Sequence, residues 1–234
     1  MLAKYFVSLV PTTKWLAAFV FVSVALLGCG KGEDRQARYM ERANTYFAEE
    51  NFEKARIELR NVLQINPKNA DARYLLGKLS FQDGDVRKAY GSLLAALEVE
   101  PDHLPANLLL AEIFLSFKGF DQVLEYTNKV LNIDTKNAEA MGLKALALSE
   151  SGDKEQALSL ANDALALDAG NAPAVAVVVQ EAFKAGDQDR AMAVVTAAQE
   201  TNPTESKIAK MKISLLQSMG RTDQVEAELK SLVK

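Results

Sequence analysis

Histidine and cysteine, two side chains often used in catalysis and metal binding, each occur once in this sequence, as His103 and Cys29. The sequence contains no His/Cys/Asp cluster with metal-binding spacing and no glycine-rich loop of the kind that binds phosphate. His103 lies between Pro101 and Pro105, where a solvated turn residue is expected. We therefore predict that the protein is not an enzyme, needs no cofactor or metal, and has no small-molecule substrate.

Cys29 directly follows an apolar segment near the start of the chain. After Lys4 and Lys14, residues 15–27 form an apolar run that is short for a membrane span and typical of the hydrophobic region of a secretory signal. A single cysteine cannot form an intramolecular disulfide, so another use is expected for its thiol. The tetrapeptide LLGC, residues 26–29, resembles a bacterial lipobox, although its second leucine stands where a small residue is more usual.

The lipobox resemblance implies three parts: a signal peptide over residues 1–28, lipid-modified Cys29 with a linker over residues 29–35, and a folded domain over residues 36–234. Several acyl chains on one cysteine give stable membrane attachment, here facing the periplasm. Gly30 after the cysteine, in place of aspartate, favours the outer membrane. An uncleaved signal anchor with an incidental thiol is the alternative interpretation.

Composition and charge narrow the range of partners. Hydrophobic residues make up 49% of the chain and charged residues 25%, as in ordinary folded proteins. The net charge is −4, and removal of the leader with Lys4 and Lys14 leaves −6. A mildly acidic domain has no excess of basic side chains to displace counterions from phosphates, so nucleic acid is not expected as a partner.

A spacing of 34 residues recurs through the remainder of the chain. One series contains small or β-branched apolar residues: Ala55, Ala89, Val123, Ala157, Ala191 and Val225. A leucine series and a glycine series have the same spacing: Leu63, Leu97, Leu131 and Leu165, then Gly84, Gly152, Gly186 and Gly220. The chain is therefore predicted to be a repeat protein with six copies, starting near residues 36, 70, 104, 138, 172 and 206.

The copy over residues 70–101 shows what each repeat should form. An apolar stripe around Leu76 predicts a first helix, which ends where Gly84 can adopt a positive φ. A second helix is predicted from Val86 to Val99, with Ala89, Leu93, Ala96 and Leu97 on one face, before Pro101 ends it. One such pair cannot bury both apolar faces, so the copies must stack on one another.

These residues resemble the tetratricopeptide repeat (TPR) family. The matching positions are Leu76-Gly77, Ala89, Leu93, Ala96 and Pro101, whereas Arg73 and Ser80 depart from the family pattern. The resemblance implies an all-α fold, a right-handed α-solenoid of about six TPR helix-turn-helix repeats. It also implies binding of a protein, as a peptide or helix, on a concave wall built from the first helix of each repeat.

The family pattern places specific side chains on that wall. The predicted partner-binding residues share first-helix positions that face the concave side: Met40, Asn44, Phe47, Tyr74, Lys78, Phe81, Leu108, Glu112, Leu115, Gln180, Phe183 and Lys184, with Lys207 and Lys210 near the end. The carboxylate clamp of chaperone-binding TPR domains is not expected, because four of its five positions hold other residue types.

The resemblance implies a non-catalytic interaction scaffold: a membrane-anchored, periplasmic TPR lipoprotein that assists assembly of an envelope export or pilus machine. Small TPR lipoproteins of exopolysaccharide export and PEP-CTERM systems, and of type IV pilus biogenesis, look similar to this chain. The alternative is a carbohydrate-binding or enzyme-associated lipoprotein of polysaccharide export, whose aromatic wall stacks on sugars. Loss of glycan binding on Phe47→Ala and Tyr74→Ala would favour this alternative.

Overall fold

A computed structural model describes residues 32–231, so the predicted signal peptide and lipidated Cys29 lie outside the described residues. Within that range the regular structure is helical, and the helices form consecutive antiparallel pairs. The first members of the pairs after the opening helix are α3 (Ala70–Gln82), α5 (Leu104–Ser116), α7 (Ala138–Ser151), α9 (Ala172–Lys184) and α11 (Ser206–Ser218). These five helices start at the residues where the second to sixth copies were expected to start.

The second members of the pairs follow short turns. They are α2 (Phe52–Ile65), α4 (Val86–Val99), α6 (Phe120–Ile133), α8 (Lys154–Leu167), α10 (Gln188–Thr201) and α12 (Thr222–Ser231). The partner of α2 is a helix over residues 32–48 in the described part of the chain. This helix begins before residue 36, so residues 32–35, which were predicted to be a linker, are helical.

The helices begin at capping residues that also recur every 34 positions. Asn69, His103, Asn137 and Asn171 each accept a hydrogen bond from the backbone N–H three residues later, at the start of a first helix. Asn51, Asp85, Asp153 and Asp187 do the same at the start of second helices. Each cap satisfies an N–H that has no partner within its helix, and so fixes where that helix begins.

The turn inside each repeat requires one residue with positive φ. Gly84, Gly152, Gly186 and Gly220 have this conformation, as the 34-residue glycine series predicts. At the same position the first and third repeats have Glu50 and Lys118, with φ of 55° and 58°. A side chain makes this backbone conformation unfavourable, and the hydrogen bonds that close the two turns, from Asn51 N–H to the Tyr46 carbonyl and from Gly119 N–H to the Phe114 carbonyl, offset that cost.

Replacing Lys118 with glycine should therefore stabilise the protein. We expect Lys118→Gly to raise the free energy of unfolding by about 0.5–1 kcal/mol, because relief of backbone strain exceeds the added entropy of the unfolded chain. Urea denaturation provides the measurement, and Gly186→Ala should shift stability in the opposite direction. A loss of stability in Lys118→Gly would contradict this explanation of the turn.

The hydrophobic core runs through the stack and belongs to no single repeat. Ala89, Leu93 and Ala96 are fully buried, as predicted, and a Cβ atom at Gly77 would lie 3.0 Å from Leu93 Cγ. The largest buried cluster extends from Ala70 to Ala147 and so joins three successive repeats. Each helix pair is therefore stabilised by the pairs before and after it.

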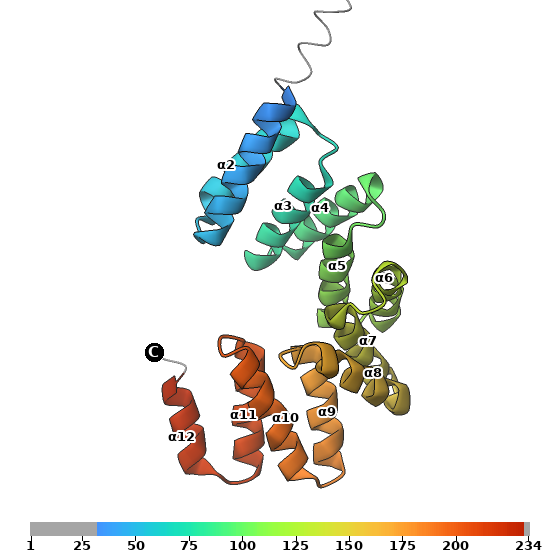
Figure 1. Ribbon diagram of the computed structural model, residues 1–234, viewed down its shortest axis with the longest axis vertical. Coiled ribbons are helices and arrows are strands. Elements are labelled where there is room, and N and C mark those ends of the chain that lie inside the picture. Colours follow the sequence, from blue (N-terminus) through green and yellow to red (C-terminus); the bar gives the residue numbers. More distant parts are fainter. Residues whose placement is uncertain (1–31, 232–234) are drawn as a thin grey trace, which may run out of the picture.

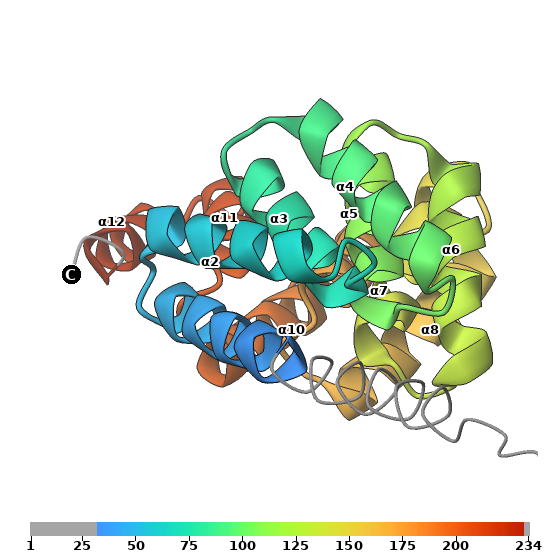
Figure 2. The ribbon, with the colours of Figure 1, turned by 90° about the horizontal axis from the view of Figure 1, so that it is seen from above.

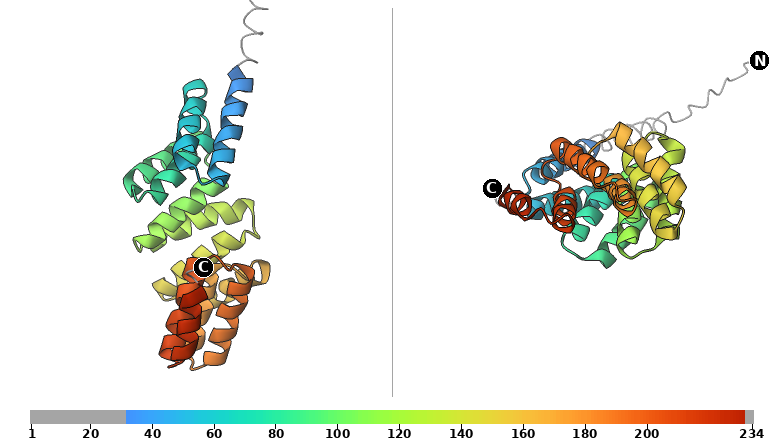
Figure 3. Two further views of the ribbon diagram at one scale, coloured as in Figure 1. Left: turned by 90° about the vertical axis from the view of Figure 1, so that its left-hand side faces the viewer. Right: turned by 90° about the horizontal axis from the view of Figure 1, so that it is seen from below.

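The stacked pairs follow a curve. In Figure 1, α2 and α12 lie on the same side of the molecule, while α5 to α8 form its opposite side. Figure 2 shows α4, α6 and α8 on the outside of the curve, with α5 and α7 towards the inside. The side view in Figure 3 shows the repeats following one another along the long axis. The first helices of the pairs consequently face the concave side.

Candidate protein-binding groove

Three adjoining hollows lie along the first helices of the second to sixth repeats. The N-terminal hollow, of about 480 Å³, is lined from α3, α5 and α7. The central hollow, of about 590 Å³, is lined from α5, α7, α9 and α11 and the turn before α9. The C-terminal hollow, of about 540 Å³, lies between α7, α9 and α11. Because neighbouring hollows share lining residues, we treat them as one groove.

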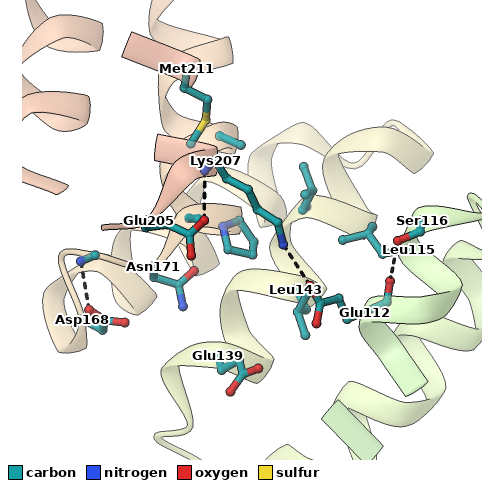
Figure 4. A pocket seen from close by; sticks show the side chains of 15 residues that line it. Glu112, Leu115, Ser116, Glu139, Leu143, Asp168, Asn171, Glu205, Lys207 and Met211 are labelled. Carbon is teal, nitrogen blue, oxygen red and sulfur yellow. Dashed lines mark hydrogen bonds and ion pairs between the residues drawn. The ribbon is translucent and has the colours of Figure 1, made fainter. Parts of the chain in front are cut away.

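Carboxylates dominate the charged side chains of the central hollow. Glu112, Glu139, Asp168 and Glu205 line it together with one basic side chain, Lys207 (Figure 4). Their formal charges sum to −3 when all five groups are ionised. Asp168 accepts a hydrogen bond from the backbone N–H of Gly170, which fixes the turn before α9.

An ion pair crosses the central hollow. Lys207 Nζ on α11 lies 2.9 Å from Glu112 Oε1 on α5, although the two residues are 95 positions apart in the sequence (Figure 4). The hydrogen bond to Glu112 raises the pKa of Lys207, so the ammonium form is favoured. The two side chains remain 64% and 35% exposed, and exposed pairs of this kind contribute only about 0–1 kcal/mol.

The Glu139 carboxyl has a pKa above its ordinary value. Its surface remains accessible to water, but the groove walls remove part of its hydration, and this raises its pKa. The nearby Glu112 carboxylate raises the pKa further, while Lys78 on α3 and Lys207 on α11 oppose the shift. Within residues 32–231 no basic side chain forms an ion pair with Glu139.

A raised pKa makes ionised Glu139 a cost to folding. We expect Glu139→Gln to raise the melting temperature at pH 7, where the wild-type carboxylate is charged. The gain should disappear well below 4.5, the ordinary pKa of the group, because the carboxyl is then protonated in both folded and unfolded protein. Thermal unfolding at several pH values provides the test, and a lower melting temperature for Glu139→Gln at pH 7 would contradict it.

Seven of the predicted partner-binding residues line the groove. Tyr74, Lys78 and Leu108 line the N-terminal hollow, Glu112 lines both the N-terminal and central hollows, and Leu115 lines the central one. Gln180 and Phe183 line the C-terminal hollow, and the Phe183 side chain is 42% exposed. Lys207 and Lys210 also line the groove, as predicted for the last repeat.

The other five predicted residues do not line these hollows. Met40 and Phe47 pack against the N-terminal core cluster, and Phe81 packs against the largest cluster. Asn44 is exposed on the helix over residues 32–48. Lys184 Nζ is 2.9 Å from Glu181 Oε1 on the same helix. Contact of these five with a partner remains a prediction that the groove geometry does not support.

Sequence reasoning missed groove residues in the fourth repeat and at the ends of helices. Glu139, Leu143 and Leu146 come from α7, which contributed none of the predicted residues, and Met211 comes from α11. The sequence did indicate Glu139, because this residue lies two repeat lengths before Lys207 and so occupies the same position in its repeat. Lys207 had been placed on the concave wall. Asn171 and Glu205 reach the groove from capping positions, which the pattern of inward first-helix positions does not include.

His103 is not the solvated turn residue that was predicted. Its side chain is 4% exposed, and Nδ1 accepts a hydrogen bond from the backbone N–H of Ala106 at 3.1 Å. Because Nδ1 must carry a lone pair to accept this bond, Nε2 carries the hydrogen and donates to Asp71, also at 3.1 Å. His103 thus caps α5 in the same way that Asn69 caps α3, a structural role for the only histidine.

Two kinds of feature are absent from residues 32–231. No group of three or more His, Cys, Asp and Glu side chains there is placed to hold a metal ion. None of the helices in that range combines the length and apolar character needed to span a membrane.

Sequence comparisons match parts of this chain to repeat proteins. The TPR repeat profile matches residues 43–84. Tetratricopeptide repeat protein 4 of Mus musculus is 26% identical over 119 residues, which cover 49% of this chain and 31% of that protein. Anaphase-promoting complex subunit 3 of Dictyostelium discoideum is 30% identical over 76 residues, or 32% of this chain and 8% of that protein. The chain therefore spans less than a third of the length of these curated relatives.

Solved structures share the fold over most of the chain. PilF of Pseudomonas aeruginosa superposes with a TM-score of 0.66 at 14% identity, covering 85% of this chain and 90% of PilF. The type IV pilus biogenesis factor PilW also gives 0.66, at 17% identity, covering 84% and 91%. YrrB, a TPR protein with an unusual peptide-binding site, gives 0.54 at 18% identity, covering 74% and 90%. At these identities the similarity establishes the fold alone.

Proposed function

We propose that this tetratricopeptide-repeat protein is a non-catalytic scaffold that is attached to a membrane by lipid on Cys29 and binds a partner protein in its groove. The observation that carries the proposal is the groove itself. The second to sixth repeats contribute charged and apolar side chains to adjoining hollows along it. A surface of this length suits an extended peptide or a helix, which needs several anchoring contacts along its length.

For the biological setting, we infer assembly of an envelope machine. PilW is described as a type IV pilus biogenesis factor, and most of this chain has a similar fold. The lipobox-like sequence that ends at Cys29 supports attachment facing the periplasm, and Gly30 after the cysteine favours the outer membrane. Pilus assembly and polysaccharide export are both compatible with these observations.

A sugar-binding role receives less support from the aromatic side chains. Phe47 packs edge-on against Phe52, with ring centroids 5.5 Å apart, and Tyr74 lies 5.3 Å from the His103 ring. Each contact engages part of a ring that a sugar would need as an open stacking surface. Binding to a glycan array that is lost on Phe47→Ala and Tyr74→Ala would favour the sugar-binding alternative.

A pull-down tests the scaffold function. Full-length protein purified from a detergent extract of its own cells should retain one protein in stoichiometric amount. Because Phe183 lies in the groove and is exposed, Phe183→Ala should release that protein. Ile57→Ala, which alters an exposed residue of α2, is the matched control and should still retain the partner protein. Retention by both variants, or by neither, would contradict binding in the groove.

The membrane attachment has its own test. We expect labelling of the wild-type protein by a palmitate analogue and complete loss of the label in Cys29→Ser, because acyl transfer requires the thiol. Labelling that persists in Cys29→Ser would rule out lipidation at this residue.

A further inference from the structure

The groove is charged at its centre and apolar at its C-terminal end. The central and C-terminal hollows share Leu146, Ala176 and Met211, so a segment lying in one reaches the other. Val179 and Leu215 extend the apolar lining beside Phe183. An occupant that matches both parts needs a cationic group and an apolar group close together.

Lys207 indicates how the cationic group would bind. Its ammonium lies against Glu112, in a hollow that three further carboxylates also line. This contact is largely exposed to solvent, so a competing cation can replace it at little cost. Once Lys207 is displaced, the central hollow still has four carboxylates. A cation from the partner would then offset part of their negative charge.

Glu139 adds a reason for a second positive charge in this hollow. Neither Lys207 nor Lys78 forms an ion pair with it, and the Lys78 amine instead lies over the Phe47 ring, 5.6 Å from its centroid. A cation placed between Glu112 and Glu139 would offset the repulsion between the two carboxylates. Of the two basic side chains, arginine fits better, because its planar guanidinium can donate to two carboxylates at once.

We propose that the groove recognises a protein segment in which an arginine or lysine lies next to a large apolar residue. The basic side chain displaces Lys207 from Glu112 and binds among the carboxylates of the central hollow. The apolar side chain enters the C-terminal hollow beside Phe183 and Met211. This inference rests on the proposed function and specifies the chemistry of its partner.

A peptide selection tests this chemistry before the partner itself is identified. A random twelve-residue library displayed on phage is selected against the full-length protein in detergent, and enriched peptides are made with a fluorescent label. We expect enrichment of arginine or lysine within a few positions of leucine, isoleucine, phenylalanine or methionine. Anisotropy titration of the most enriched peptide then reports its affinity for each variant.

The variants distinguish recognition from a general effect on folding. Glu112→Gln combined with Glu139→Gln should weaken peptide binding by about tenfold or more, because two carboxylate partners are lost. Lys207→Ala should strengthen binding by about two- to fivefold, because the internal competitor is removed. Lys129→Ala, which breaks the exposed pair with Glu125 on α6, is the matched control and should leave binding unchanged.

Three results would overturn the inference. These are enrichment of peptides without a basic residue, weaker binding by Lys207→Ala, and binding that does not respond to the glutamine substitutions. Failure to enrich any peptide would also count against it. The stoichiometric pull-down judges the scaffold function separately, so a partner released by Phe183→Ala but lacking a basic–apolar segment would refute only this inference.

Discussion

Leu110→Ala should lower the free energy of unfolding by about 2–5 kcal/mol, as expected for removing a large side chain from a fully buried site. Leu110 has no exposed surface and belongs to the cluster that joins the second, third and fourth repeats. This loss of stability has two sources: the apolar side chain is no longer buried, and a cavity remains where it was. Because the site lies in the middle of the stack, repeats on its two sides should also become less tightly coupled.

Urea unfolding followed by circular dichroism measures both consequences of this change. The midpoint should fall, and the transition should broaden or separate into two steps. Leu167→Ala is the matched control, because the Leu167 side chain is 50% exposed at the end of α8 and should cost much less. Equal losses from the two substitutions would contradict a core shared between repeats.

Gly142→Ala should be almost as damaging, for a different reason. A Cβ atom at Gly142 would lie 2.0 Å from Asn171 Oδ1, so the asparagine would have to move. Asn171 caps α9 through the N–H of Ala174 and donates to the carbonyl of Ala138 on α7, which ties two repeats together. We expect a loss of about 2–3 kcal/mol from crowding and the broken cap, less the gain in helix propensity.

Two comparisons isolate this mechanism. Gly91→Ala changes a helical glycine with open space around it and should stabilise the protein by up to about 1 kcal/mol. In a double-mutant cycle, Gly142→Ala should cost less when Asn171 is already alanine, because the displaced group is absent. Additive losses in that cycle would show that the asparagine is not what makes alanine costly at this position.

The repeat length predicted most of the local structure. The bounds of α4 and the starts of the first helices followed from the 34-residue spacing, since the same residues must meet the same neighbours in each copy. The left-handed backbone conformation of Gly84 was predicted from the same spacing. Lys118 and Glu50 could not be assigned by residue type, because the turn requires this conformation of side chains that disfavour it.

The groove was predictable only in part. Side chains such as Glu112 and Phe183 could be placed on the concave wall because the first helix of each repeat has one inward face. The pairing of Glu112 with Lys207 could not be predicted from the sequence, because it depends on how far each repeat rotates relative to the one before. His103 shows a related limit: its side chain contacts Tyr74 and Asp71 of the preceding repeat, which the residues on either side of it in the sequence do not reveal.

Photo-crosslinking in living cells tests most directly whether the groove binds a protein. Benzoylphenylalanine replaces Phe183 in the groove or, as a control, Ile57 on α2; both positions are exposed in the structure. We predict a discrete crosslinked species of one partner protein from position 183, and none from position 57. A species from position 57 alone, or no crosslink from position 183 while the protein remains folded, would contradict binding in the groove.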